Sequence, residues 1–231
     1  DYTVLEWLII KMVNNETLAD DNRAVYVITS TDTIVRNNII YLDLVSTVSG
    51  SDGKVGYFAI HESNGTRNYY LYNNIIYGFN HGGGGGTGWR GVFFSMGSNF
   101  FTKNMYVYNN TVYGSSAEGI VFSTRNSNNI YLANNIAIGN GGGDFGLADA
   151  DNNFVTNDYN ASGDSTAAGA NSLTSVASSI FQSTTSGSED FKLASGAAVI
   201  DEGTDLGTTP SGVNIDIIGR NRDAEGDTWD I

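Results

Sequence analysis

The pair His61-Glu62 has the residue types that acid–base chemistry on a sugar requires. A histidine titrates near neutral pH and can act as a base, and an arginine can hold a carboxylate. If the protein is an enzyme, we expect β-elimination on an acidic glycan, with His61 or Lys103 as the base and a cation or Arg90 neutralising the sugar carboxylate. The alternative is a hydrogen-bonded surface histidine beside a solvated Glu62.

A glycine-rich segment with aromatic and basic neighbours could bind a sugar ring. His81 precedes five consecutive glycines at 82–86, and Trp89 and Arg90 follow them. An indole stacks on apolar ring faces, and a guanidinium clamps planar acidic groups. We therefore expect His81 and Trp89 to contact substrate. The alternative is that Trp89 is tucked onto the scaffold.

Three aspartates form a candidate calcium site. Asp149 and Asp151 are two residues apart, which places both side chains on one face of a strand, and Asp144 lies shortly before them. Carboxylate and amide oxygens are the ligands that Ca²⁺ prefers. The sequence thus indicates Ca²⁺ as a cofactor; the alternative is an ordinary Asp/Asn turn.

A repeated phrase predicts the architecture that positions these residues. Paired asparagines, each followed by apolar residues, begin at Asn37, Asn73, Asn109 and Asn134, at intervals of 36, 36 and 25 residues. Asn tolerates left-handed backbone, so we interpret these four as structural corner residues, and stacked asparagines can form an amide ladder. We expect a degenerate copy at 157–161 and an earlier one near 7–10.

A second column of alternating segments recurs between the asparagine phrases. It predicts short strands with inward Val25, Tyr57, Val92, Ile120 and Phe145. Repeats of variable length favour a solenoid, in which additional residues form loops between stacked strands. Stacking would bring Arg125 and Asp149 into the rungs that follow His61, with Glu62 and Arg125 as further substrate-binding residues.

The repeats and the tail together resemble a known family. Asn-Asn-Ile-Ile-Tyr (37–41 and 73–77) and Asn-Asn-Thr-Val-Tyr-Gly (109–114) resemble right-handed parallel β-helix proteins of the pectin-lyase-like superfamily. Residues 198–207, 215–222 and 229–231 resemble the C-terminal region of extracellular β-helix proteins of the choice-of-anchor type. The resemblance implies an all-β right-handed parallel β-helix, export to the cell surface, and, for many lyases of this fold, Ca²⁺.

The chain divides into rungs and a terminal segment of the same domain. We expect residues 1–160 to form the β-helix, 161–188 to wrap its side, and 189–231 to cap its open end. The edge at 2–5 has no evident cap, so we expect upstream rungs or another subunit to cover it.

Composition excludes several classes of protein. The 231 residues contain no Cys, which excludes disulfide scaffolds and thiol chemistry. A net charge of −14 disfavours nucleic-acid binding, and no apolar run is long enough to span a membrane. The chain starts at Asp1 without a signal-like segment, so we expect a processed or truncated piece of an exported protein.

Two functions follow from these observations. The first is a secreted module that binds or cleaves extracellular polysaccharide, lyase-like if catalytic. The second is a non-catalytic surface or appendage subunit, or an adhesin, that self-associates through the solenoid ends. An ice-binding or passive sugar-binding array is less consistent with the irregular outward columns.

Overall fold

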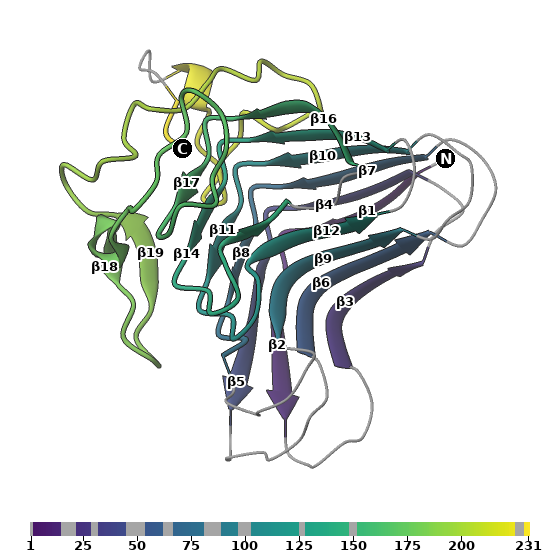
Figure 1. Cartoon of the computed structure of the whole chain (residues 1–231), viewed down its shortest axis with the longest axis horizontal. Helices are drawn as coiled ribbons and strands as arrows, with labels where there is room; N and C mark the ends of the chain where they lie inside the picture. Colours follow the sequence, from purple (N-terminus) through teal and green to yellow (C-terminus); the bar gives the residue numbers. More distant parts are fainter. Residues whose placement is uncertain are drawn as a thin grey trace.

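The computed structural model is an all-β molecule in which three parallel sheets enclose one core (Figure 1). It describes residues 2–14, 22–28, 32–44, 54–61, 67–80, 89–96, 103–124, 128–147, 152–224 and 229–231. Strands β1 to β17 belong to the three sheets in turn, so each turn of the chain adds one strand to every sheet, except that the last turn adds none to the third. This arrangement confirms the predicted parallel β-helix.

The sheets are named A, B and C, and their strands are given in spatial order. Sheet A consists of β1 (Tyr2–Glu6), β4 (Asp32–Arg36), β7 (Arg67–Tyr72), β10 (Lys103–Tyr108), β13 (Asn128–Ala133) and β16 (Asn152–Asp158). Sheet B consists of β2 (Ile9–Asn14), β5 (Ile39–Leu44), β8 (Ile75–Tyr77), β11 (Thr111–Tyr113), β14 (Ile136–Ile138) and β17 (Ala161–Ser162). Sheet C consists of β3 (Asn22–Ile28), β6 (Lys54–His61), β9 (Arg90–Met96), β12 (Ile120–Thr124) and β15 (Phe145–Gly146). The C-terminal part holds two 3₁₀ turns, η1 (Ser178–Ile180) and η2 (Arg222–Ala224), and an antiparallel hairpin of β18 (Phe181–Ser183) and β19 (Asp190–Leu193).

The predicted stacking of the repeats is confirmed residue by residue. Ile39 pairs with Ile75, Ile75 with Thr111, and Thr111 with Ile136, all in parallel register. The inward column of sheet C is buried throughout, as predicted: Val25, Tyr57, Val92, Ile120 and Phe145. Equivalent residues of successive rungs therefore pack on one another along the whole solenoid.

The corner between sheets A and B requires left-handed backbone in every rung. Asn37, Asn73, Asn109 and Asn134 all have φ between 53° and 57° there. Trp7 occupies this position in the first rung and Tyr159 in the last, with φ of 58° and 56°. The expected copy at 157–161 was aligned two residues out of register, because Asn157 pairs with Leu132 inside the strand.

The second asparagine of each pair forms a buried amide ladder. The amide Nδ2 of Asn38 donates to Oδ1 of Asn74, Asn74 to Asn110, Asn110 to Asn135, and Asn135 to Asn160, each at 3.0 Å. The backbone N–H of each residue in the series donates to the same oxygen. A buried polar network of this kind stabilises one register, because a slip by one residue would leave several amides without partners.

Two further ladders lie on the outer face of sheet A. The Nδ2 groups of Asn153, Asn129, Asn104 and Asn68 donate in sequence along the rungs, and Asn68 donates to the carboxylate of Asp32 at 3.0 Å. Beside them, the rings of Tyr70, Tyr106 and Tyr131 are stacked with centroids 4.8 and 4.6 Å apart. The outward columns of this sheet are thus more regular than the sequence suggested.

Residues 163–176 contact the last rung at the C-terminal end of the solenoid. Leu173 forms a parallel bridge with Ala161, and its N–H donates to the Asn160 carbonyl at 2.8 Å. The N–H of Asn160 donates to Oγ of Ser172 at 3.0 Å, so a serine hydroxyl takes the place of the next ladder asparagine. Over sheet C, Thr166 accepts the N–H of Phe145 at 2.9 Å.

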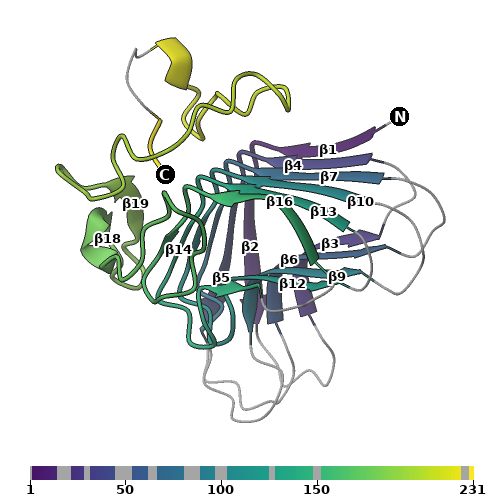
Figure 2. The same cartoon turned by 45° about the horizontal axis from the view of Figure 1, so that its top comes forward.

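The segment from 200 to 222 returns along the outside of the A–B corner (Figure 2). Side-chain amides of the corner asparagines donate to its carbonyls: Asn134 to Thr204 at 2.8 Å, Asn109 to Val213 at 3.1 Å, and Asn73 to Ile215 at 2.6 Å. Residues 163–176 thus contact the last rung, and the described residues 200–222 follow the side of the solenoid.

Candidate functional site

The structure places the predicted bases at one corner of the solenoid. His61 ends β6 in sheet C and Lys103 begins β10 in sheet A, so both border the corner where the chain passes from sheet C to sheet A. In backbone register His61 pairs with Met96, and Met96 with Thr124, as the repeat predicted. Their side chains are outside the described part of the structure.

Several other predicted residues also lie outside the described residues. These are the substrate-binding candidates Glu62, His81 and Arg125 and the calcium candidates Asp149 and Asp151. Their roles remain predictions.

Trp89 does not form the exposed sugar platform that was expected of it. Only 4% of its surface is exposed, and it belongs to the main hydrophobic core. Its backbone N–H donates to Oγ of Ser116 at 3.2 Å, and its carbonyl accepts from Ala117 at 3.0 Å. The indole is thus packed onto the scaffold, as in the alternative interpretation. A ring buried in this way offers no face to a sugar.

Arg90 is already paired within the fold. Its Nε lies 2.7 Å from Oε2 of Glu118, and the guanidinium lies 4.8 Å from the ring centre of Phe93. This charge-assisted bond fixes the side chain beside the strand. A sugar carboxylate could take the guanidinium only by displacing Glu118.

Asp144 is a structural carboxylate and not an open metal ligand. Only 2% of its surface is exposed. Its Oδ1 accepts hydrogen bonds from the backbone N–H of Asn140 at 3.1 Å and from Nδ2 of the same residue at 2.8 Å. Its Oδ2 accepts from the backbone N–H groups of Gly163 at 2.7 Å and Asp164 at 3.1 Å. Burial raises the pKa of Asp144, and these hydrogen bonds offset part of that rise. No metal-binding group of three acidic, histidine or cysteine side chains occurs within the described ranges. The calcium prediction therefore rests on Asp149 and Asp151.

A groove that the sequence did not reveal runs along the outer face of sheet B. It has a volume of about 630 Å³. Its floor is the outward column of the sheet, and its walls are the β18–β19 hairpin and the returning C-terminal segment. The floor residues are Ile39, Ile75, Thr111 and Ile136. This volume and mixture of apolar and polar walls are typical of ligand sites.

The groove also reaches the A–B corner at Asn73, Asn109 and Asn134 and is called the corner groove below. The hairpin supplies an aromatic wall to it. The ring of Phe191 lies 5.0 Å from that of Tyr77 and 5.6 Å from that of Tyr113, both in tilted arrangements. Burial, reinforced by Glu189, raises the pKa of Tyr77 to about 12, so its hydroxyl remains a proton donor at any physiological pH.

The polar wall carries more acidic than basic side chains. Five acidic and three basic residues line the groove: Glu189, Asp190, Asp201, Asp216, Asp230, Lys192, Arg220 and Arg222. Arg222 is held by hydrogen bonds to Oδ1 of Asn73 at 3.3 Å and the Val213 carbonyl at 3.1 Å. The described lining therefore has an acidic excess of two charges, which disfavours an anionic ligand.

One signal in the sequence could have located the groove. Ile39, Ile75 and Ile136 occupy outward positions, where a sheet facing water normally carries polar residues. A repeated apolar outward column therefore indicates that something covers it. The cover itself comes from Glu189 and later residues, at least 53 positions after Ile136 and 150 after Ile39, and no local pattern identifies it.

Comparisons with protein-family models, with curated proteins and with solved structures gave no match. The chain is therefore placed by its architecture, a parallel β-helix with internal asparagine ladders. Among the described residues, no helix is long and apolar enough to cross a bilayer. Parallel β-helices carry many unrelated activities, so the function has to be argued from the site.

Proposed function

We propose that this protein is an exported polysaccharide-binding module related to the pectin-lyase-like β-helix proteins, and that a glycan occupies the corner groove. The observation that carries this proposal is the groove itself, with its apolar floor, aromatic wall and polar rim on a rigid scaffold. A sugar presents apolar C–H faces and polar hydroxyls at once, which is the combination that this lining complements.

The charge of the groove favours a neutral glycan. Its acidic excess and the net charge of −14 both repel uronates and phosphate backbones. Hydroxyl groups of a neutral sugar can donate to the carboxylates and accept from Lys192, Arg220 and the phenol of Tyr77. The preferred substrate class thus differs from the acidic glycan expected for a lyase.

Binding, not cleavage, is the activity that the groove supports. The residues expected to carry β-elimination, His61 and Lys103, border the C–A corner, whereas the groove lies on the outer face of sheet B. The described lining contains no histidine. Extracellular or cell-surface location, and calcium bound at Asp149 and Asp151, remain part of the proposal.

The test is a binding screen with a variant that fills the groove. Isothermal titration against soluble β-glucan, mannan, xylan and polygalacturonate, each with calcium and with EDTA, should show binding to a neutral member. Thr111→Phe places a ring on the groove floor and should weaken that binding about tenfold or more, which corresponds to about 1.4 kcal/mol.

The matched control for this variant is Thr156→Phe. Thr156 is also a half-buried threonine, in sheet A next to Tyr131 in register, and it lies away from the groove lining. It should bind as the wild type does. Failure of every neutral glycan to bind, or equal affinity of the Thr111→Phe variant and the wild type, would refute the proposal, and release of unsaturated products would show a lyase instead.

A further inference from the structure

The floor of the corner groove becomes covered towards the C-terminal end of the solenoid. Its residues in three successive rungs, Ile39, Ile75 and Thr111, are half-buried, whereas Ile136 in the fourth rung is only 3% exposed. The next residue of this outward column is Ala161, which pairs with Ile136, is fully buried and does not line the groove. The groove therefore ends at the rung of Ile136.

An apolar cluster closes the groove at this end. The N–H of Ala194 donates to the Ile180 carbonyl at 2.7 Å, and the ring of Phe181 lies 5.2 Å from that of Phe191, so the hairpin is fixed to the cluster. A ligand could pass Ile136 only by exposing these apolar side chains to water, which is unfavourable. The buried members of the cluster are Ile136, Ile138, Ala161, Val176, Ile180, Phe181, Val199 and Ile231.

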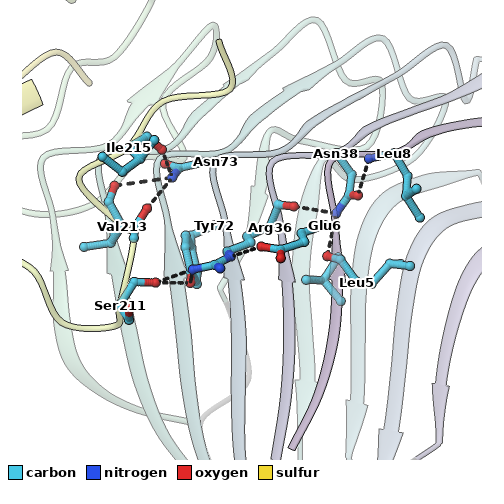
Figure 3. Close-up of polar contacts among 12 residues, drawn as sticks. Leu5, Glu6, Leu8, Arg36, Asn38, Tyr72, Asn73, Ser211, Val213 and Ile215 are labelled. Carbon is cyan, nitrogen blue, oxygen red and sulfur yellow. Dashed lines mark hydrogen bonds and ion pairs between the residues drawn. The ribbon is translucent and has the colours of Figure 1, made fainter. Parts of the chain in front are cut away.

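The opposite end of the groove has no such cover among the described residues. The returning segment, whose residues 216–218 line the groove, reaches the rung of Ile39, where Arg36 and the hydroxyl of Tyr72 both donate to the Ser211 carbonyl (Figure 3). In the next strand of sheet B, Ile9 pairs with Ile39 and continues the outward column, so β2 does not block the groove. A ligand longer than the groove can leave it at this end.

The groove is thus closed at one end and open at the other. Its floor from Ile39 to Ile136 covers three rung steps of about 4.8 Å, which gives a length of about 14 Å. The hairpin on one side and the returning segment on the other prevent a chain from crossing the floor sideways. The interior of a long polymer needs two exits from its site, and this groove provides one.

We propose that the corner groove binds the end of a neutral glycan chain and not its interior. This inference rests on the proposed glycan-binding function and adds which part of the polymer is recognised. The terminal sugar lies over Thr111 and Ile136, and the chain leaves over Ile75 and Ile39.

Polar groups at the closed end suit a chain terminus. Asp201 and Asp230 line the groove, and Oδ1 of Asp230 accepts from the N–H of Asp201 at 2.9 Å. They border the closed end because Ile231, the neighbour of Asp230, belongs to the closing cluster. Each end of a glycan carries a hydroxyl that the interior sugars lack, and these carboxylates and the hydroxyl of Thr111 can accept a hydrogen bond from it.

Partial hydrolysis of a polymer separates end binding from interior binding. Isothermal titration compares intact β-glucan, mannan and xylan with the same polymers cut to short oligosaccharides. The number of protein molecules bound per gram of glycan should rise in proportion to the chain ends created. An unchanged number per gram would overturn this inference and leave glycan binding in place, whereas failure of every neutral glycan to bind would overturn both.

Modification of the chain ends shows which of the two enters the groove. Borohydride opens the ring at the reducing end, and a cyclic acetal caps the hydroxyls at the other end. One of these changes should weaken binding of a β-glucan or mannan oligosaccharide about tenfold or more, and the other should have little effect. Unchanged affinity of an oligosaccharide modified at both ends would overturn the inference.

A matched pair of floor variants locates the terminal sugar. Ile39→Phe and Thr111→Phe each place a ring on the floor, the first near the open end and the second near the closed end. A disaccharide should lose about tenfold in affinity with Thr111→Phe and less than about twofold with Ile39→Phe, whereas a longer oligosaccharide should lose affinity with both. A disaccharide that is weakened more by Ile39→Phe would contradict the assigned direction of the chain.

Discussion

Replacing one ladder asparagine tests whether the buried amides hold the solenoid in register. Asn110 is nearly fully buried in the middle of the ladder. Leucine at this position has the same branching and number of side-chain heavy atoms but removes four hydrogen bonds. Oδ1 of Asn110 accepts from the N–H and Nδ2 of Asn74 at 3.1 and 3.0 Å, and Nδ2 donates to the Leu71 carbonyl at 2.9 Å and to Oδ1 of Asn135 at 3.0 Å.

The expected loss in the free energy of unfolding is a large fraction of the total. At about 1 kcal/mol for each of the four bonds, Asn110→Leu should cost about 3–5 kcal/mol. A domain of this size loses about 2–4 °C of melting temperature per kcal/mol, so calorimetry should show a fall of about 6–20 °C.

The half-buried asparagine ladder on the outer face of sheet A provides the matched control. Asn104→Leu makes the same chemical change on the outer face of sheet A, where Asn104 is bonded to Asn68 and Asn129 at 2.9 Å each. Water can replace those bonds, so the cost should be below about 1 kcal/mol. Equal destabilisation by the two variants, or a change below about 1 kcal/mol for Asn110→Leu, would refute the argument that burial of the amides is what matters.

Three further predictions concern pH and packing. Because the pKa of Tyr77 is raised from 10.0 to about 12, the fold favours the neutral phenol. This stabilisation is complete below pH 10 and should be lost as pH rises through 12. The melting temperature of Tyr77→Phe should therefore fall less steeply with alkaline pH than that of the wild type. Burial opposes ionisation of Asp158, but its hydrogen bonds, first those from Asn171, lower the pKa of this carboxyl overall. The ionised carboxylate therefore stabilises the fold at neutral pH, and this stabilisation is lost on acidification. Asn171→Ala should reduce the loss of stability between neutral and acidic pH, and an unchanged loss would contradict this. Gly91→Ala should destabilise the protein by about 1–3 kcal/mol in urea denaturation, because the added methyl group would overlap the side chain of Val112, and wild-type stability would show that the rungs can move apart there.

The sequence predicted the stacked columns because each rung repeats the same residue types at the same corner. Ile39, Ile75 and Thr111 could be aligned from the asparagines before them. The last rung was misaligned because its corner residue is Tyr159 and not an asparagine, so Asn157 just before it was taken for the corner, whereas Asn160 holds the ladder position.

The side chains of the candidate site were harder to predict than the strands. Trp89 comes just before β9, where the alternation of inward and outward residues does not yet apply, and neighbouring glycines suggested exposure. The groove depends on contacts such as that of Asn73 with Ile215, which are separated by 142 residues. Patterns within one rung carry no information about such contacts.

The contacts of the returning C-terminal segment also depend on the number of rungs that it spans. Its carbonyls at Thr204 and Val213 meet the amides of Asn134 and Asn109, which belong to successive rungs, and Ser211 reaches as far as Arg36 near the other end. Excision of one whole repeat would preserve the stacking of the remaining strands. It would also shift the corner asparagines relative to the carbonyls of this segment, so that their hydrogen bonds could not all form. The spacing of the rungs between Arg36 and Asn134 is thus specified twice in the chain, once by the repeats and once by the segment that contacts them.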